Sequence, residues 1–332
     1  MKIHWLVFLS ILLASCNKSP EVVVYSTVDQ VFSEPVLKNF ERQTGIKVRA
    51  VYDTEETKST GVMNRLIAEK NNPQCDVFWS GDPLRNNILK SENMLEPSPS
   101  AQAALIPEHF KDKNNFWIGF SARARVLIYN KNLIQVGSLP KSLLDLTNPR
   151  YKGKFVIANP LFGTTTFHIA ALFSTIGEEQ AKQWLHEIKA NGLVIATSNG
   201  DVKKRVMNGE AALGLTDTDD AFEAIKESDV VDFVFLDQQS GGMGSLIMPN
   251  ALSLIKNSPN AENGRKLIDY LLSRETEAML AVSCAQMPVI KGTPVPDNIP
   301  SLDKIAPMKI DYDQTSRILK EIQPWLKQWA AP

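Results

Sequence analysis

The sequence has few cysteines and histidines, and it carries no excess charge of either sign. Its 332 residues include three cysteines and four histidines, and 36 Lys and Arg residues against 37 Asp and Glu residues leave a formal charge of −1. Three cysteines are too few for a disulfide scaffold or an ordinary zinc site. A charge near zero provides no general attraction to nucleic acid or to an anionic membrane. Because 43% of the residues are hydrophobic, disorder is excluded, and the length predicts about two domains.

Motifs of catalysis are also missing. There is no Gly-x-Ser-x-Gly elbow, no phosphate-binding loop ending in Gly-Lys-Ser/Thr and no His-Glu-x-x-His. The histidines His109, His168 and His186 are scattered without metal-ligand spacing, and we interpret each as structural or exposed. The segment Gly241–Gly244 lacks dinucleotide spacing and is interpreted as a flexible turn. We therefore expect neither an enzyme nor a resident cofactor.

No apolar run approaches the roughly 20 residues of a membrane span, but residues 1–15 have the pattern of an export signal. Lys2 gives a positive start, Ile3–Leu13 an apolar stretch, and Ala14 and Ser15 the small residues before cleavage. The alternative is an ordinary buried helix followed by an incidental cysteine.

The four residues Leu13-Ala14-Ser15-Cys16 resemble the lipobox of bacterial lipoproteins, in which the cysteine is lipidated and becomes the first residue of the mature chain. The resemblance implies a lipid on Cys16, a short polar tether over residues 16–20 and a place in the cell envelope. The folded part would then lie on the periplasmic or extracellular face of a bacterial membrane.

The rest of the chain alternates strand and helix signals, which predicts an α/β fold. The apolar run Val22–Tyr25 is typical of a strand buried on both faces. The triplet Ser33-Glu34-Pro35 predicts the start of a helix that ends at Gly45. A second cycle begins near Tyr129, and residues 246–248 and 251–255 are candidates for two further strands.

Polar, turn-forming clusters follow several of the predicted strands. Ligands of open α/β sheets bind outside the carboxyl ends of the strands, so these clusters are candidates for the lining of one cleft. Each of them can alternatively be a simple helix cap. The clusters are Ser26–Asp29, Ser80–Asp82, Gly163–Thr166, Ser198–Gly200 and Thr216–Asp220.

Two of the clusters suggest particular ligands. Gly163–Thr166 stands at the start of an apolar helix, where free N–H groups and hydroxyls can bind an anion; the alternative is N-capping by one threonine. Thr216–Asp220 contains three carboxylates, which can bind a cation or an ammonium group or can stabilise the first turn of the next helix. This run lacks the spacing of a calcium-binding helix–loop–helix.

Several short segments occur in an order and spacing that together are typical of one family. They are Val24–Ser26, Phe40 with Thr44–Val48, Ala68–Lys70, Asp76–Trp79, Asn148–Lys154 and Asn208–Ala211. On these segments nearly the whole mature chain resembles the extracellular solute-binding proteins of ABC importers, in the branch that contains ferric-iron, phosphonate and sugar-phosphate binders.

The resemblance implies a bilobal fold of the type II periplasmic-binding-protein class, in which two α/β lobes are joined by crossing hinge strands and close on a small solute. We expect one lobe over 21–120 plus 246–286 and the other over 121–245 plus 287–332. The implied partners are a small-molecule ligand, a membrane permease and its ATPase, and the implied state is a monomer.

The sequence departs from the ferric-binding members of this branch. They hold iron with adjacent tyrosines after the strand that here ends at Leu215, helped by a histidine and a glutamate. Here Thr218-Asp219 replaces the tyrosine pair, the histidine position falls near Val28-Asp29 and the glutamate position near Gly81. No two tyrosines are adjacent anywhere in the chain, so iron held by tyrosinate is not expected. The anion-binding helix N-terminus of that branch, by contrast, matches Gly163–Thr166, with Asn199 and Thr216 as partners.

An anion site that faces carboxylates suits a small zwitterionic or phosphorylated anion, such as an aminoalkylphosphonate. In this hypothesis the acid group is held by Thr164, Thr165, Thr166 and Asn199, and an amine or hydroxyls by Asp217 or Asp219. The full set of predicted binding residues is Thr27, Asp29, Ser80, Asp82, Thr164, Thr165, Thr166, Asn199, Thr216, Asp217 and Asp219.

Alternatives remain open at this stage. The ligand can be a ferric or divalent metal held by carboxylate oxygens, which would come from Asp29, Asp82, Asp217 and Asp219. More remotely, the chain can be a secreted hydrolase that uses an aspartate as base. Separately, Cys75 and Cys284 either form a disulfide in an oxidising compartment or remain two buried thiols.

Overall fold

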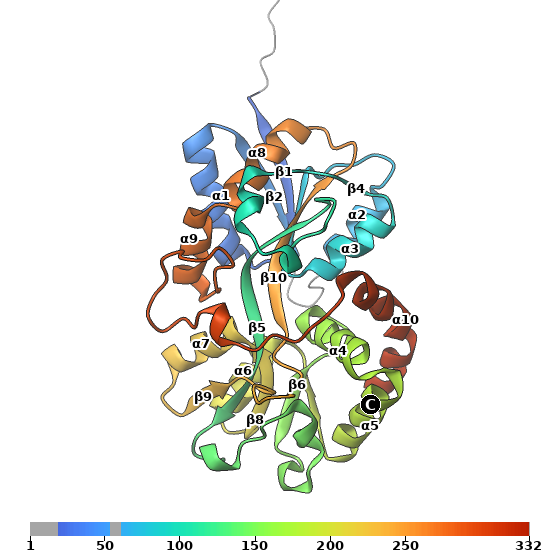
Figure 1. Ribbon diagram of the computed structural model, residues 1–332, viewed down its shortest axis with the longest axis vertical. Helices are drawn as coiled ribbons and strands as arrows, with labels where there is room; N and C mark the ends of the chain where they lie inside the picture. The colour runs from blue at the N-terminus through green and yellow to red at the C-terminus, as the bar shows by residue number, and fades with distance from the viewer. Residues whose placement is uncertain (1–18, 54–60, 332) are drawn as a thin grey trace, which may run out of the picture.

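We describe a computed structural model of the chain, which covers residues 19–53 and 61–331. Two lobes are stacked along its long axis and are connected by long strands (Figure 1). The predicted export signal, Cys16 and residues 17–18 of the tether lie outside the described residues. Within the described ranges there is no helix with the length and apolar character that crossing a bilayer requires.

The upper lobe in Figure 1 is built on a mixed sheet covered by helices on both faces. Strand β1 (Glu21–Ser26) pairs in parallel with its two neighbours, and the sheet continues through two antiparallel strands. The strand order is β2 (Lys47–Tyr52), β1 (Glu21–Ser26), β3 (Val77–Ser80), β10 (Ile247–Ile255) and β5 (Ile118–Asn130), with β4 (Leu95–Glu96) beside β10. The helices are α1 (Gln30–Thr44), α2 (Gly61–Ala68), α3 (Pro83–Ser91), α8 (Ala261–Leu271) and α9 (Arg274–Cys284).

The lower lobe repeats this arrangement on the other half of β5. The strand order is β5, β8 (Leu213–Asp217), β6 (Phe155–Ala158) and β7 (Val194–Ala196), and β9 (Val231–Val234) also pairs with β5. The helices are α4 (Gly163–Ile176), α5 (Glu178–Ala190), α6 (Asn199–Met207), α7 (Thr218–Glu227) and α10 (Tyr312–Ala330). Along the described chain, short 3₁₀ turns occur at Ala101–Leu105, Glu108–Phe110, Val136–Ser138, Leu143–Thr147, Pro149–Tyr151 and Leu302–Lys304. Both lobes combine a sheet with covering helices, so the expected α/β class is confirmed.

Three segments cross between the lobes. Strand β5 pairs with β10 over residues 118–124 and with β8 over residues 125–129. Strand β10 is one continuous strand with a register shift between Pro249 and Asn250, whereas the sequence predicts two separate strands around that proline. The third segment crosses between Ile305, which packs in the upper core, and Met308, which packs in the lower core. Before it crosses, the chain after α9 is joined to β5 by reciprocal 2.7 Å hydrogen bonds between the backbones of Ala122 and Met287.

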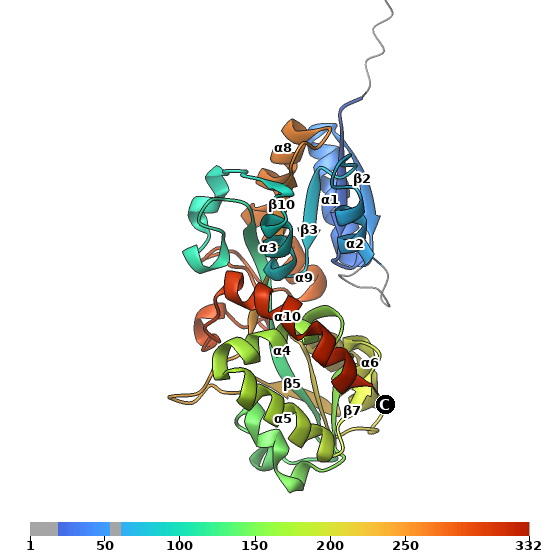
Figure 2. The ribbon, with the colours of Figure 1, turned by 90° about the vertical axis from the view of Figure 1, so that its right-hand side faces the viewer.

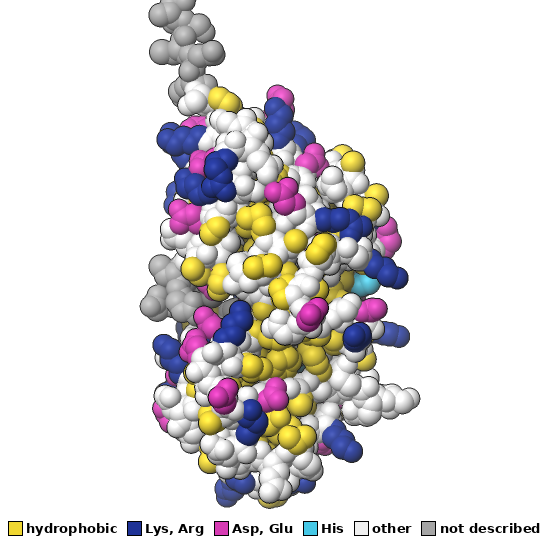
Figure 3. All heavy atoms as spheres, turned by 90° about the vertical axis from the view of Figure 1, so that its left-hand side faces the viewer, with side chains coloured by type: hydrophobic (Ala, Val, Ile, Leu, Met, Phe, Trp, Pro, Cys, Tyr) yellow, Lys and Arg dark blue, Asp and Glu magenta, His cyan; other side chains and the backbone are white. Residues whose placement is uncertain are grey.

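Each lobe has its own hydrophobic core. The chain after Met287 was expected in the lower lobe, but Met287, Val289 and Ile290 pack in the upper core before the chain crosses. Helix α10 packs against α4 of the lower lobe and α3 of the upper lobe (Figure 2). Hydrophobic side chains also gather around the level where the lobes meet on the face shown in Figure 3. Apolar contacts therefore contribute to the junction as well as to the two cores.

Helix α1 begins earlier than its sequence predicts. We expected Ser33-Glu34-Pro35 to open it, but the first helical residue is Gln30 and Asp29 occupies the N-cap position. Pro35 consequently lies inside the helix, where it removes one backbone donor. The earlier start matters for function because it places the Asp29 carboxylate at the junction between the lobes, where it lines the cavity described below.

Candidate functional site

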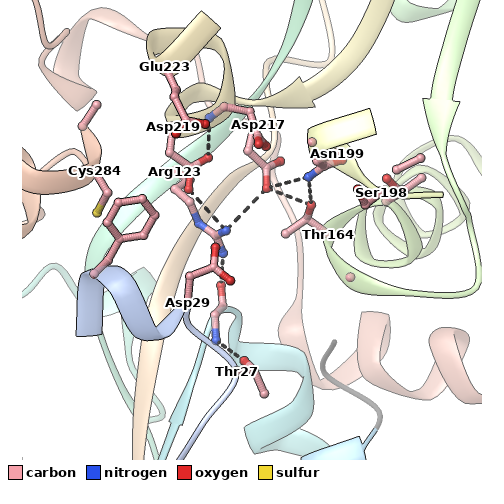
Figure 4. Close-up of a pocket in the computed structure, with 18 of the residues that line it drawn as sticks. Thr27, Asp29, Arg123, Thr164, Ser198, Asn199, Asp217, Asp219, Glu223 and Cys284 are labelled. Carbon is pink, nitrogen blue, oxygen red and sulfur yellow. Dashed lines mark hydrogen bonds and ion pairs between the residues drawn. The ribbon is translucent and has the colours of Figure 1, made fainter. Parts of the chain in front are cut away.

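A cavity lies between the two lobes, where the strands cross. Its volume is about 440 Å³, a size typical of small-molecule sites. The ends of β1, β3, β6 and β8 open onto it, as do the starts of α1, α4, α6 and α7 (Figure 4). It is thus formed by the carboxyl ends of parallel strands and by helix N-termini, which is where open α/β sheets bind ligands.

Most of the predicted binding residues come together in this cavity. Those that line it are Thr27, Asp29, Asp82, Thr164, Thr165, Asn199, Asp217 and Asp219. Three others, Ser80, Thr166 and Thr216, are buried and lie outside the lining. Thr216 is next to Asp217 on β8, so their side chains point to opposite faces of the sheet, and the Thr216 hydroxyl donates to Asp220 at 2.9 Å.

Asp217 is the centre of a buried hydrogen-bond network. Its Oδ1 accepts a hydrogen bond of 2.7 Å from Nη1 of Arg125, and its Oδ2 accepts bonds of 2.8 Å from the Thr164 hydroxyl and 3.2 Å from the Asn199 amide. Burial opposes ionisation of Asp217, but the neighbouring Arg125 and Arg123 outweigh it and lower the pKa of the carboxyl. The carboxylate is therefore ionised and already neutralised by the protein.

This network changes the roles that we expected for three residues. Thr164 and Asn199 donate to the Asp217 carboxylate, so their donors are directed at an acid group of the protein itself. Asp217 in turn has Arg125 as its cation, so it is poorly suited to bind the amine of a solute. The carboxylates that remain to bind an amine are those of Asp29, Asp219 and Asp220, which also line the cavity.

The N-terminus of α4 remains a donor site. The N-cap residue is Phe162, and among the described residues no side chain caps the first turn, so none of the threonines acts as the cap that we considered. The turn contains no acidic residue, and Gly163, Thr164 and Thr165 all line the cavity. Helix α6 opens onto the same wall, but its N-cap Ser198 accepts the N–H of Asp201, and that acidic residue lies in its first turn. Since first-turn N–H groups lack partners within a helix, the start of α4 attracts an anion.

Acidic side chains gather on the α7 side of the cavity. Asp219 and Asp220 offer carboxylate oxygens that lie within 4.8 Å of one another and of the Asp217 carboxylate, which itself contacts Thr164 of α4. Asp29 approaches from the upper lobe (Figure 4). Burial raises the pKa of Asp219 to about 6, with a further contribution from the Asp217 charge and opposition from Arg123. Close carboxylates of this kind favour a bound positive charge.

Asp82 lines the cavity, but its carboxylate stabilises the start of α3. Its Oδ1 caps α3 by accepting the N–H groups of Leu84 and Arg85, and its Oδ2 forms an ion pair of 2.5 Å with the Arg85 guanidinium. Both side chains are almost fully buried. Its carboxylate is therefore satisfied by neighbours on its own helix.

The sequence analysis missed Arg123, which reaches across the cavity. Its Nη2 donates a 2.6 Å hydrogen bond to the carbonyl of Gly81 in the upper lobe. Its Nη1 lies 3.5 Å from Asp217 and 3.7 Å from Asp219 in the lower lobe. Burial lowers the pKa of Arg123, but the surrounding aspartates outweigh it and raise the pKa above its ordinary value. The sequence does contain a signal for this residue, because Arg123 and Arg125 interrupt an otherwise apolar stretch. Charged side chains that are buried in such a stretch require partners.

The two described cysteines are separate buried thiols, so the disulfide alternative is wrong. Cys75 packs in an apolar cluster with Tyr25 and Phe78, while Cys284 ends α9 at the edge of the cavity. Burial raises the pKa of the Cys284 thiol to about 12. It is therefore an uncharged part of the cavity wall.

Two α/β lobes that enclose a polar cavity at their crossing strands define a bilobal binding protein. Residues 72–315 match the family of bacterial extracellular solute-binding proteins. The chain belongs to that family.

Named relatives lie in the branch that the sequence resembles. The iron uptake protein A1 of Synechocystis is 27% identical over 330 residues, which cover 89% of each chain. The putative 2-aminoethylphosphonate-binding periplasmic protein of Salmonella typhimurium is 26% identical over 339 residues, which cover 99% of this chain and 94% of that one. The structure of iron-bound HitA from Pseudomonas aeruginosa has a TM-score of 0.83 at 24% identity and covers 92% of this chain and 99% of that one.

These similarities confirm the type II bilobal fold and the expected class of protein. The relatives are binding and uptake proteins, so the chain is a solute-binding protein and not an enzyme. The hydrolase alternative is thereby unsupported. The family description and the periplasmic relatives place the protein on the periplasmic or extracellular side.

Proposed function

We propose that the protein captures a small solute that carries a phosphonate or phosphate group together with an amine, for an ABC importer. The observation that carries this proposal is the polarity of one cavity. The N-terminus of α4, which has no side-chain cap among the described residues, opens onto one wall. Away from it, Asp29 of the upper lobe and Asp219 of the lower lobe flank Arg123 (Figure 4), and Asp220 also lines the cavity.

The acid group of the solute would bind at the N-terminus of α4. The partial positive charge of this helix start and its first-turn N–H groups, which no described side chain caps, stabilise an anion. The Thr165 side chain adds a hydroxyl at this wall, and its oxygen lies 3.5 Å from Nη2 of Arg125. A charge-assisted hydrogen bond in such a place is worth roughly 1.5–3 kcal/mol.

The amine of the solute would bind beside Asp219 of the lower lobe and Asp29 of the upper lobe, next to the Arg123 guanidinium, which lies 3.7 Å from Asp219. An ammonium group there also favours ionisation of Asp219, whose pKa burial has raised to about 6. A solute of this kind matches the name of the 2-aminoethylphosphonate-binding relative of Salmonella. Asp29 belongs to the upper lobe and the N-terminus of α4 to the lower lobe. A solute that contacts both would therefore hold the lobes together.

The test is an isothermal titration with 2-aminoethylphosphonate on two variants of neighbouring threonines. Thr165 lines the cavity, whereas Thr166 lies outside it and its hydroxyl has no hydrogen-bond partner among the described residues. Thr165→Val should weaken binding about tenfold or more, and Thr166→Val should leave it unchanged. Equal affinity in both variants contradicts this placement of the acid group.

A second candidate ligand is a metal ion, ferric or divalent. It is favoured by the close carboxylate oxygens of Asp217, Asp219 and Asp220 and by the names of the iron-binding relatives. Against it stands the guanidinium of Arg123, within 3.7 Å of two of these carboxylates. In addition, neither tyrosine nor histidine occurs among the described residues that line the cavity. A melting temperature that falls on treatment with a chelator would support the metal.

We also propose that Cys16 carries a lipid that anchors the protein to a bacterial membrane, where it meets the permease and ATPase as a monomer. The basis is the signal and lipobox pattern of residues 1–16. Mass spectrometry of the N-terminal peptide from a membrane fraction tests the anchor. Cys16→Ser should release the protein from that fraction, and retention of the variant there contradicts the proposal.

A further inference from the structure

Buried polar side chains join the two strands that cross between the lobes to a third segment, which belongs to the upper lobe. The strands are β5 near Ser121 and β10 near Asn250, and the third segment runs from Gln286 to Ile290. Ser121, Asn250 and Gln286 are all at most 2% exposed. This point lies next to the crossing, because β5 changes its partner from β10 to β8 between residues 124 and 125.

Glu277 lies beside this junction on α9, with no exposed surface. Its Oε1 accepts the backbone N–H of Ser121 at 2.8 Å and that of Val289 at 3.0 Å, and its Oε2 accepts that of Ile290 at 3.0 Å. One carboxylate thus ties β5, just before it crosses to the lower lobe, to α9 and to the segment that follows α9 in the upper lobe. Burial raises the pKa of Glu277, and these N–H groups partly offset the effect.

The backbone at this point is unusual. Ser121 has a φ of +45°, a region that is costly for residues other than glycine and persists only where the surroundings impose it. The Asn250 amide donates to the Ser121 carbonyl at 2.6 Å and to Oε1 of Gln286 at 2.7 Å. Ser121 is therefore held through its N–H by Glu277 and through its carbonyl by Asn250.

Strand β5 connects this junction to the cavity, because it contains both Ser121 and Arg123. Ser121 is two residues before Arg123, whose guanidinium contacts Gly81 of the upper lobe and the aspartates of the lower lobe. A change in the backbone at Ser121 moves the guanidinium within the cavity. Helix α9, which carries Glu277, ends at Cys284 on the cavity edge.

We propose that Glu277 is the positioning residue of the hinge: by joining Ser121 to Val289 and Ile290, it sets how far the lobes open and so how tightly the cavity holds its solute. Glu277 itself does not line the cavity. The proposal rests on the bilobal fold and is independent of which solute is bound.

The test measures the distance between the lobes in the ligand-free protein by pulsed electron paramagnetic resonance. Spin labels are placed at Asn71→Cys in the upper lobe and Lys204→Cys in the lower lobe, both exposed positions. The variant is Glu277→Gln, which keeps the size of the side chain but replaces one acceptor oxygen by a donor. The matched control is Glu275→Gln on the same helix, because the exposed Glu275 contacts Asn39 and Gln43 within the upper lobe.

Glu277→Gln should broaden or shift the inter-lobe distance, while Glu275→Gln should leave it as in the wild type. If the solute-competent geometry becomes the minor population, affinity falls in proportion, by roughly tenfold for a tenfold loss of population. A folded Glu277→Gln protein with the wild-type distance distribution overturns the proposal. A purely structural role would lower the melting temperature without this change in distance.

Hydrogen exchange on the wild-type protein provides a second measurement in case the variant does not fold. The amides of Ser121, Val289 and Ile290 should exchange slowly, as a group, and more slowly than the amides of exposed loops. If these three amides exchange as fast as those of exposed loops, the carboxylate does not hold the segments and the proposal is wrong.

Discussion

Nη1 of Arg125 lies 2.7 Å from Oδ1 of Asp217, and each side chain is 1% exposed. The pair joins β5, which crosses between the lobes, to the end of β8 at the cavity. Thr164 and Asn199 complete the network around the carboxylate. The cavity wall is therefore assembled around an internal ion pair.

Removing the charge of Asp217 should destabilise the protein. Asp217→Asn leaves the Arg125 guanidinium buried without its counter-charge, which costs about 3 kcal/mol or more in free energy of unfolding. Urea denaturation measures this loss. The double variant Asp217→Asn with Arg125→Gln should recover part of it, since no unpaired charge remains. A loss that is simply additive in the double variant contradicts the pairing.

His168 should make the protein sensitive to acid. Burial and the neighbouring Arg125 lower the pKa of His168 to about 3 in the folded protein, whereas an unfolded histidine has a pKa of about 6.5. Between these values the unfolded chain binds a proton that the folded chain does not, so the free energy of unfolding falls as the pH drops from about 6.5 towards 3.

Denaturation of His168→Gln over this pH range checks the effect. The variant should lose much of the dependence on pH between about 6.5 and 3, although its stability at pH 7 need not rise. His186→Gln serves as the control, because His186 is exposed. Its aromatic contact in the described structure is with the edge of the Trp325 ring. Identical pH profiles for the wild type and His168→Gln would mean that His168 titrates normally.

Arg123 should protect the cavity from metal cations. Arg123→Met removes the guanidinium beside Asp217 and Asp219, and the clustered carboxylates then repel one another unless a cation binds. Manganese(II) should raise the melting temperature of this variant by several degrees and have little effect on the wild type. Arg123→Lys keeps the positive charge and should behave like the wild type. Equal metal stabilisation of all three proteins contradicts a protective role.

Local sequence patterns predict the α/β alternation and the polar clusters at the strand ends, because both depend on residues that are close in sequence. They fail where a partner is distant. Arg125 and Asp217 are separated by 92 residues, so the sequence identifies Asp217 as acidic but not as neutralised. The long strand β5 was missed because two arginines interrupt its apolar pattern, and those arginines are buried only through tertiary contacts.

Thr165 and Thr166 show the same limit within one helix. Both hydroxyls belong to the predicted anion-binding cluster, and the sequence does not distinguish them. Their positions around α4 do, since only Thr165 lines the cavity. Which side chains of the first turn of α4 face the cavity depends on how the helix is oriented toward the upper lobe. The local sequence does not determine that orientation.

The most direct test of the central claim is an isothermal titration of the purified protein with 2-aminoethylphosphonate, inorganic phosphate and ferric citrate in parallel. Saturable binding of 2-aminoethylphosphonate, stronger than that of phosphate and weakened by Asp219→Asn but not by the exposed Asp229→Asn, is the predicted result. Binding of ferric iron without any response to the phosphonate would contradict it, and the carboxylates of the cavity would then be metal ligands.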